Sequence, residues 1–597
     1  DHPRAALVPE RLEPLVTTAT RTPTSVRTLG TATDFLDAAE AARRQVSSLA
    51  DLLGDTSGSP LFSSGAPGGS TALFLRGANS NQTLFLVDGL RLNDPNTDYA
   101  VFLGGACLAA CDSLEIAHGP QSTLYGGEAI GGVVSLRAGR GAGDPRARAA
   151  LELGSFGTVQ AAATAQGERG ASAYHVAVQG GHTDNERPHN AFASANTTVR
   201  LDHTLNERVA IGGTLRWFHG DYESPGDRYT NDPDNREQED NLLVTTFVNF
   251  RPATAWRTRV TLGGQDRRFV STNPGPTGTA VTVVKNRRGV LDWQTTWTGA
   301  ERHRVTAGFT AEANHTRNTG FGDINERQQL VAVFVQDEFS PADHVHITAG
   351  LRSDDFDTFG RQTTGRVTAA WLLAQERVKL RGSYGTAFRS PSFLDLYGRS
   401  ASYVGNPGLR PETARGGDAG VDFYLADAHG TFGITWFENR FRDLIVYDFA
   451  VFPSTVANVE RARTRGIEVK ADLKVDAATR LQLAYTGLEA DNLTQSTRLL
   501  RRPRYALGAD LGHEWSERFN AGVGIRWVAQ REDVDAATFR TVDGEDYTVM
   551  RIYAAWTINP RLTLRARVEN LLDERYDEVN GYPQPGVGAY VGVEWRF

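Results

Sequence analysis

The chain ends with the sequence VGAYVGVEWRF, from Val587 to Phe597, and this stretch decides the fold. In an extended strand, one face would carry only apolar side chains, those of Val587, Ala589, Val591, Val593, Trp595 and Phe597. The opposite face would carry glycine, tyrosine and charged residues. A hydrophobic period of two predicts a β-strand with one apolar and one polar side.

The same alternation recurs through the last three quarters of the chain, for example in LTLRARVEN from Leu562 and in HVHITAGLR from His344. The connections between these segments come in two kinds. Short polar turns lie at Leu205–Arg208, Ser340–Asp343, Asp476–Thr479, Ser516–Arg518 and Asn559–Arg561, and long polar excursions lie at His219–Asp240 and Val528–Thr548. Short turns at one rim and long loops at the other are typical of an outer-membrane β-barrel. We therefore expect an all-β transmembrane barrel rather than a soluble sandwich.

Composition excludes several other classes of protein. The longest apolar runs, such as Leu330–Val335, fall far short of the roughly 18 residues of a membrane-spanning helix. A net charge of −8 argues against a nucleic-acid-binding protein, and 2 cysteines in 597 residues cannot form a disulfide scaffold. No Ser/His/Asp arrangement stands out, so we do not expect an enzyme. The chain starts without Met or a signal segment, which suggests an exported, processed protein.

The first 140 residues have a different pattern. Asp34 is a candidate N-cap for a helix over Asp34–Asp55 that ends at Gly54. Short strands are expected at Ala72–Gly77, Thr83–Gly89, Ser113–Gly119 and Gly131–Gly139. The sequence therefore predicts a tail over 1–23, a small α+β domain over 24–140, a linker over 141–146 and a barrel over 147–597.

Several stretches resemble signatures of the TonB-dependent outer-membrane transporters. Leu73–Pro95 and Ser113–Leu136 are similar to the two plug signatures of that family, and Val568–Phe597 resembles its C-terminal signature. AFRSPSFLDLYG from Ala387 and NPGLRPE from Asn406 resemble its two mid-barrel boxes. The resemblance implies a monomeric, 22-stranded antiparallel barrel that an N-terminal α+β plug occludes, in the outer membrane of a Gram-negative bacterium.

The resemblance also assigns a role to the start of the chain. Leu15, Val16, Thr17, Thr18 and Ala19 resemble the Ton box, the segment through which TonB, with ExbB and ExbD, drives transport. The segment is β-prone and lies between Pro14 and Pro23, so we expect it to stay outside any sheet of its own and to pair with the edge of a partner's sheet. A frayed terminus is the alternative.

Within the plug signatures, we expect turns and plug-to-barrel pairing at Arg76, Gly77, Asp88, Gly89, Gly119, Pro120, Gly131 and Gly132. His118 stands where the family usually has arginine, and is either a hydrogen-bonded plug histidine or a ligand. Cys107 and Cys111 are four residues apart, which would suit a soft metal, a local disulfide or two packed thiols.

Two groups of residues are candidates for ligand binding. The acidic stretch from His219 could hold calcium in an extracellular loop through Asp221, Asp227, Asp232, Asp234 and Asp240, or could simply be a solvated loop. The span Arg389–Asn406 between the mid-barrel boxes has no histidine, which argues against haem, and offers Tyr397 and Tyr403 as substrate contacts.

The resemblance implies active uptake of a small metal chelate. The length of the chain, the form of the Ton box and the acidic loop favour cobalamin, with ferric siderophores as the alternative and haem behind both. A passive porin would lack both plug and Ton box, so the first 140 residues argue against it.

Overall fold

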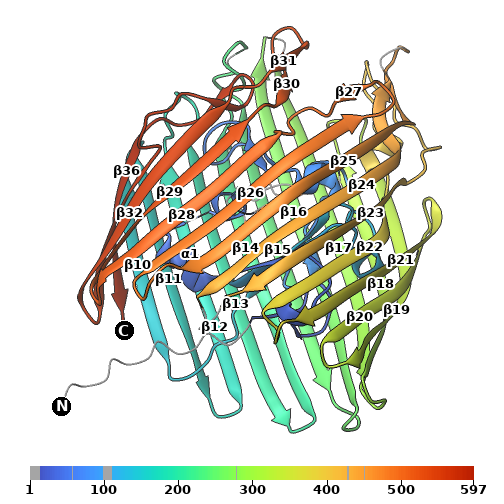
Figure 1. Ribbon diagram of the computed structural model, residues 1–597. Coiled ribbons are helices and arrows are strands. Elements are labelled where there is room, and N and C mark those ends of the chain that lie inside the picture. Colours follow the sequence, from blue (N-terminus) through green and yellow to red (C-terminus); the bar gives the residue numbers. More distant parts are fainter. Residues whose placement is uncertain are drawn as a thin grey trace.

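The computed structural model describes residues 14–597, except 47, 55, 57, 59, 98–110, 231, 277, 426–428 and 449–450. Over the described residues, the chain from Arg146 onward forms a closed antiparallel barrel of 22 strands (Figure 1). The last strand pairs with the first, Arg148 opposite Arg596, so the sheet has no free edge. The predicted barrel is confirmed.

Each barrel strand pairs with the next along the chain. The strands are β10 (Arg146–Gly154), β11 (Thr158–Arg169), β12 (Ser172–Thr183), β13 (Phe192–Asn206), β14 (Val209–Glu223), β15 (Arg236–Phe250), β16 (Trp256–Gly275), β17 (Gly278–Trp297), β18 (His303–Asn318), β19 (Ile324–Ala342), β20 (Val345–Phe356), β21 (Gly360–Leu373), β22 (Val378–Arg389), β23 (Glu412–Tyr424), β24 (Gly430–Asp448), β25 (Thr455–Lys474), β26 (Thr479–Asn492), β28 (Tyr505–Ser516), β29 (Phe519–Ala529), β32 (Tyr547–Asn559), β33 (Leu562–Glu569) and β36 (Gly588–Arg596). The connections add β27 (Thr497–Arg498), the hairpin of β30 (Glu532–Val534) and β31 (Thr541–Asp543), the pair of β34 (Asp577–Val579) and β35 (Tyr582–Pro583), and helix α4 (Phe393–Tyr397).

The outer wall of the barrel is apolar, as the alternation predicts. In β19, Val331, Val333 and Val335 are 47–54% exposed, whereas Ala332 and Phe334, between them in the sequence, are 1% and 4% exposed. In β36, Val591 and Trp595 point outward in the same way, and Glu594 faces the interior. None of the helices in the described part of the chain is long and apolar enough to cross a membrane.

The two rims of the barrel differ in the length of their connections. Turns such as 207–208, 343–344 and 517–518 join strands at one rim, and long loops such as 390–411 and 570–587 join them at the other. We call these the short-turn rim and the long-loop rim.

Nearly half of the predicted excursion His219–Asp240 is strand, and its loop covers only 224–235. His219 lies opposite Asp240, and Asp221 lies opposite Gln238. The predicted excursion was too long because a barrel strand continues beyond the apolar band. There polar residues can occupy both faces of the strand, so polar composition does not mark a loop.

The N-terminal domain lies inside the barrel (Figure 1) and is built around a mixed five-stranded sheet of order β3-β8-β9-β6-β7. Its elements are β1 (Leu15–Val16), β2 (Thr24–Ser25), η1 (Val26–Thr28), β3 (Thr33–Asp37), α1 (Ala38–Arg43), α2 (Leu49–Gly54), β4 (Leu61–Ser63), β5 (Thr71–Leu73), η2 (Leu75–Gly77), η3 (Ser80–Gln82), β6 (Thr83–Val87), β7 (Leu90–Arg91), β8 (Cys111–His118), α3 (Ser122–Tyr125) and β9 (Gly132–Ala138). A cluster of buried apolar side chains, including Leu53, Leu75, Ile116 and Val134, packs the sheet against α2.

The single helix predicted over Asp34–Asp55 is wrong. Residues 33–37 form β3 instead, because they pair with the edge of β8, with Asp34 opposite Ile116. Asp37, not Asp34, caps the first helix by accepting a hydrogen bond from the backbone of Glu40 at 2.7 Å. Of the predicted strands, Thr83–Gly89, Ser113–Gly119 and Gly131–Gly139 correspond to β6, β8 and β9. The strand predicted over Ala72–Gly77 is correct only as far as Leu73, because the chain then turns into η2.

An outward-facing charge tests the position of the apolar band. We expect Val333→Arg to destabilise the folded barrel by about 2–4 kcal/mol, because an arginine at mid-band must leave water. The matched change Val281→Arg, near the long-loop rim, should cost about 1 kcal/mol or less. Reversible unfolding in phospholipid vesicles measures both, and equal losses would contradict the assignment.

Candidate functional site

Arg76 anchors the plug to the barrel wall through a buried ion-pair cluster. Its guanidinium donates to both oxygens of Glu468, at 2.9 and 2.8 Å, and to Asp418 at 2.7 Å. The three side chains are at most 1% exposed. Arg76 has φ +50° and precedes Gly77, where an added Cβ would lie 2.9 Å from the Thr464 side chain. The turn therefore brings the backbone of the plug against β25.

Further polar contacts join the plug to the wall. Asp88, at the φ +51° position before Gly89, accepts from Arg216 at 2.5 Å and from the backbone of Ala138 at 2.6 Å. Asp94 accepts from Arg267 at 2.9 Å, which also donates to Glu239. The plug is thus held by hydrogen bonds and charges, together with apolar clusters such as that of Phe62 and Phe74 with Val528.

The other plug-signature residues shape the interior of the plug. Gly119 has φ +74° and donates its N–H to the carbonyl of Gly131 at 2.8 Å. Pro120 is buried next to it. A Cβ at Gly131 would lie 2.8 Å from the Leu75 carbonyl, and one at Gly132 would lie 2.4 Å from that of Ala117. These glycines permit close backbone packing.

His118 is a fully buried plug histidine. Its Nε2 is 2.6 Å from Asp34, whose other oxygen accepts from Lys470 at 2.5 Å. Its Nδ1 is 3.9 Å from Glu468, so His118 borders the Arg76 cluster. Burial, with the charge of Lys470, lowers the pKa of His118 although Asp34 and Glu468 oppose that shift. The hydrogen bond matches the first of the two expectations for this residue.

Leu15 and Val16 are extended and the rest of Leu15–Ala19 enters a turn, so the expectation that the segment stays outside any sheet is wrong. Leu15 and Val16 pair with Thr24 and Ser25, because a turn that starts at Thr17 reverses the chain. Leu15 is 58% exposed, whereas Val16, Thr18 and Ala19 are 1% exposed. In this conformation the segment is folded against the protein, and we call it the stowed segment. Residues 1–13 of the predicted tail lie outside the described residues.

Glu115 of β8 holds this segment from the plug side. One of its carboxylate oxygens accepts from the backbone N–H groups of Thr17 and Thr18 at 2.9 and 2.8 Å, and from the Thr18 hydroxyl at 2.6 Å. The Tyr125 hydroxyl donates to the Thr18 carbonyl at 3.0 Å. In the sequence, Glu115 is a carboxylate between Leu114 and Ile116 in an otherwise apolar strand. This pattern could have identified it as a functional residue, but it was not among the predicted site residues.

The barrel wall holds the same segment from the other side, near the short-turn rim. Arg366 donates to the Ala19 carbonyl at 3.3 Å, and Gln336 donates to the Thr20 carbonyl at 3.0 Å. Arg21 forms an ion pair with Asp292 at 2.7 Å. Plug and barrel therefore share one binding site for the N-terminal segment, and a change in either can release it.

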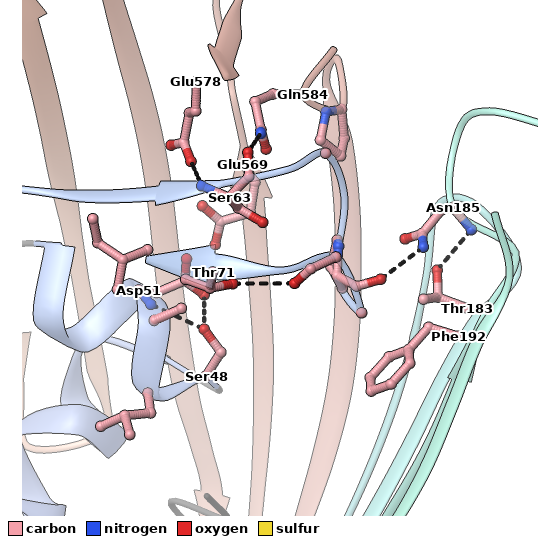
Figure 2. Close-up of a pocket in the computed structure, with 18 of the residues that line it drawn as sticks. Ser48, Asp51, Ser63, Thr71, Thr183, Asn185, Phe192, Glu569, Glu578 and Gln584 are labelled. Carbon is pink, nitrogen blue, oxygen red and sulfur yellow. Dashed lines mark hydrogen bonds between the residues drawn. The ribbon is translucent and has the colours of Figure 1, made fainter. Parts of the chain in front are cut away.

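A cavity of about 800 Å³ lies between the plug and the wall toward the long-loop rim (Figure 2). It separates α2 and the β4–β5 hairpin from strands at the barrel seam. In Figure 2, Glu578 accepts from the backbone of Ser63 at 2.7 Å, and Gln584 and Asn185 also donate to plug carbonyls.

Most polar groups that line this cavity are neutral. Hydroxyl and amide side chains include Ser48, Thr71, Gln160, Gln179, Thr183, Asn196 and Gln584. The charged lining side chains, apart from His182, are four arginines and four carboxylates, namely Arg501, Arg526, Arg551 and Arg567 with Asp51, Glu237, Glu569 and Glu578. The cavity therefore has balanced charge and many hydrogen-bonding groups.

Tyr397 and Tyr403, the predicted substrate contacts, are not among the residues that line the cavity. Tyr403 is 5% exposed, donates to the Leu394 carbonyl at 3.1 Å and packs against Phe321. Tyr397 stacks on Phe393 of the same short helix. Both tyrosines belong to a folded loop at the long-loop rim.

The five candidate calcium ligands are not brought together. Asp221 accepts from Arg236 and Gln238, Asp227 caps its own turn, Asp232 accepts from Asn273, Asp240 pairs with His219, and Asp234 is exposed. Among the described residues, no group of three or more His, Cys, Asp or Glu side chains could hold a metal. The calcium site stays a prediction, without a preformed cage. Cys107 lies outside the described residues, and Cys111 opens β8.

A closed barrel, an internal plug and a docked terminal segment together define an outer-membrane transporter that is driven from the side facing the cell interior. The chain belongs to the TonB-dependent receptor family: the family model "TonB dependent receptor-like, beta-barrel" matches residues 139–571, and "TonB-dependent Receptor Plug Domain" matches residues 25–133. It is a transporter of the outer membrane and not an enzyme. The long-loop rim is therefore extracellular, and the short-turn rim is periplasmic.

Two similar curated proteins are named as vitamin B12 transporters. BtuB of Vibrio vulnificus strain YJ016 is 25% identical over 594 residues, covering 94% of this chain and 91% of that protein. BtuB of Vibrio cholerae serotype O1 is 24% identical, covering 93% and 90%.

Two solved structures share the fold. The Pseudomonas aeruginosa receptor FpvA, bound to a ferric pyoverdine, has a TM-score of 0.83 at 15% identity, over 98% of this chain and 88% of that chain. The siderophore receptor PirA of Acinetobacter baumannii has a TM-score of 0.80 at 14% identity, over 96% and 98%.

Removal of the Glu115 carboxylate should release the stowed segment. In a background with Cys107→Ser and Cys111→Ser, we expect Glu115→Ala to raise the rate at which a thiol reagent labels Val16→Cys by about 10-fold or more, because hydrogen bonds to a charged group contribute about 1.5–3 kcal/mol each. Glu115→Gln keeps one acceptor oxygen and should have a smaller effect. Unchanged labelling in both variants would show that the wall contacts suffice.

The Arg76 cluster gives a second prediction. Arg76→Ala leaves Glu468 and Asp418 buried without the cation that hydrogen-bonds both, and Arg381 remains only at 3.8 Å from Asp418, so we expect the plug to lose about 3–5 kcal/mol of stability. Hydrogen exchange of plug amides measures this loss. The exposed pair of Arg361 and Asp355 is the control, and Arg361→Ala should cost about 1 kcal/mol or less. Similar plug protection in both variants would contradict the anchoring role.

Proposed function

We propose that this transporter imports cobalamin. The observation that carries the proposal is the balanced, amide- and hydroxyl-rich lining of the extracellular cavity. Cobalamin is large, close to neutral and edged by carboxamide groups, so it matches neutral hydrogen-bonding partners. Ligand pockets commonly have volumes of about 300–1,000 Å³, and a cavity of about 800 Å³ has room for the edge of such a ligand.

The arginines around the cavity support a neutral ligand over an anionic one. Arg567 lies 3.2 Å from Glu569, and Arg551 lies 3.2 Å from the same carboxylate. Arg501 lies 2.7 Å from Asp533. A highly charged ferric catecholate would need cations that are not already compensated, because leaving its charge unpaired on desolvation is costly.

Similarity over more than nine tenths of the chain to two proteins named as vitamin B12 transporters supports the same substrate. The siderophore receptors among the solved structures are 14–15% identical and support only the fold. We further propose that the protein works as a monomer, that TonB grips residues 15–19 and that ExbB and ExbD energise TonB.

Ligand binding tests the substrate. The purified protein is titrated with cobalamin, with ferric siderophores of catecholate and hydroxamate type, and with haem, each with and without calcium. We expect saturable binding of cobalamin that the paired change Gln160→Ala and Gln179→Ala weakens about 10-fold, through the loss of two hydrogen bonds. Preferential binding of a ferric siderophore or of haem would overturn the proposal, and a calcium effect would support the acidic loop as a metal site.

Deletion of Leu15–Ala19 separates binding from transport. We expect the deletion to leave cobalamin affinity within about twofold and to abolish uptake by whole cells, because the outer membrane has no energy source of its own. Deletion of a surface stretch of equal length, 535–539, is the control for expression and insertion. Retained uptake after removal of Leu15–Ala19 would contradict TonB coupling through this segment.

A further inference from the structure

The outer wall of strands β16–β19 carries a cationic patch near the extracellular rim. In one row across the strands, Arg268 lies opposite Lys285, and Lys285 lies opposite Arg317. In the row one step closer to the membrane, Arg287 lies opposite His315, and His315 lies opposite Arg327. We call these six residues the outer cationic patch. His315 is half-buried and the other five are exposed.

The patch starts where the apolar band of the barrel ends. On the same outward face, the first large apolar side chains toward the periplasm are Leu262 in β16, Leu291 and Trp293 in β17, and Val331 and Val333 in β19, all exposed. Asp266, Gly264, Gly289 and Gln329 lie between them and the patch. The adjacent lumen-facing residues, such as Arg267, Asn286 and Arg288, are buried, so the alternation fixes the outward direction of the patch. The cations therefore lie at the level of the headgroups of the outer leaflet.

The charges of the patch are only partly compensated within the protein. Asp266 is 3.0 Å from Arg287, and Asp323 is 3.4 Å from Arg317. Asp240 lies opposite Arg268 on the neighbouring strand β15, and its carboxylate pairs with His219 at 2.8 Å. Among the described residues, no ion pair joins Arg268, Lys285 or Arg327 to a carboxylate. Lys285 has an arginine directly opposite it on each side. Like charges that face each other across strands destabilise a sheet, so this row gains stability from an external anion.

A second run of arginines shows the difference. On β23–β25, Arg415 lies opposite Arg440, and Arg440 lies opposite Arg463. There Arg440 is 2.5 Å from Glu438 and Arg463 is 3.1 Å from Asp491, so carboxylates of the protein compensate two of the three arginines, including the central one.

We propose that the outer cationic patch binds the phosphate groups of an anionic lipid headgroup in the outer leaflet. Arginine forks match phosphate oxygens, and lysine adds a point charge between them. A lipid is favoured over a soluble anion because the patch is continuous with the lipid-facing band. The site holds the barrel to the outer leaflet at one side and is independent of the transported substrate.

Binding to lipid A in mixed detergent micelles tests the proposal. The probes are lipid A with both phosphates, the same lipid after enzymatic dephosphorylation, and inorganic phosphate. We expect the wild-type protein to bind the phosphorylated lipid and to bind the dephosphorylated lipid at least about 10-fold more weakly. Each cation near an anionic surface contributes about fivefold, so the triple change Arg268→Gln, Lys285→Gln and Arg317→Gln should weaken binding by about 100-fold.

The control removes the same number of charges at the opposite rim. Arg208, Arg518 and Arg561 are exposed residues of periplasmic turns, and their change to Gln should leave lipid A affinity within about twofold. Heat-dependent gel mobility verifies that each variant is a folded barrel. Equal affinity of the patch variant and the wild type, equal binding of both lipids, or full competition by millimolar inorganic phosphate would each overturn the proposal.

Discussion

Every backbone polar group that faces lipid must find its partner inside the protein, and this constraint governs the architecture of the whole molecule. The pairing of β36 with β10 closes the ladder and leaves no edge in the membrane. Closure of 22 strands encloses a lumen that barrel side chains alone cannot fill. A second domain is needed to occlude it. The plug, the cavity above it and the docked segment below it all follow from that requirement.

The way the plug is held follows from the same alternation that makes the outer wall apolar. Since one face of each strand contacts lipid, the other face presents many polar and charged side chains to the lumen, and the plug meets arginines and carboxylates beside a few apolar clusters. Arg76 with Glu468 and Asp418, and Asp94 with Arg267 and Glu239, are the result. Such contacts depend on geometry, so small shifts of the plug weaken several of them together.

Strand β8 contributes both to the site of the N-terminal segment and to the plug anchor. Glu115 lies on it and accepts hydrogen bonds from the segment Leu15–Ala19, and His118 ends it beside the Arg76 cluster. Both belong to the strand that pairs with β3, whose Asp34 bonds His118 and Lys470. A displacement of β8 would therefore change the plug anchor and the contacts of the N-terminal segment together. Arg366, Gln336 and Glu115 share the binding of the N-terminal segment, so its release requires the loss of only a few hydrogen bonds.

The sequence alone determined the barrel, because an apolar alternation with a period of two over hundreds of residues is compatible with a membrane only as a barrel. The asymmetry of the turns distinguished the extracellular rim from the periplasmic rim. It also located the plug strands β6, β8 and β9. It could not determine the start of the first helix, because Asp34 suits an N-cap locally and only the edge of β8 turns residues 33–37 into a strand. It predicted a free Ton-box segment, and it selected Tyr397, Tyr403 and five aspartates as ligand contacts from local composition. Only the tertiary structure decided that Glu115, Arg366 and Gln336 share the stowed segment, and that neutral side chains from both ends of the chain line one cavity. Such sites join residues hundreds of positions apart, and their partners are fixed by the closure of the barrel and not by any local pattern.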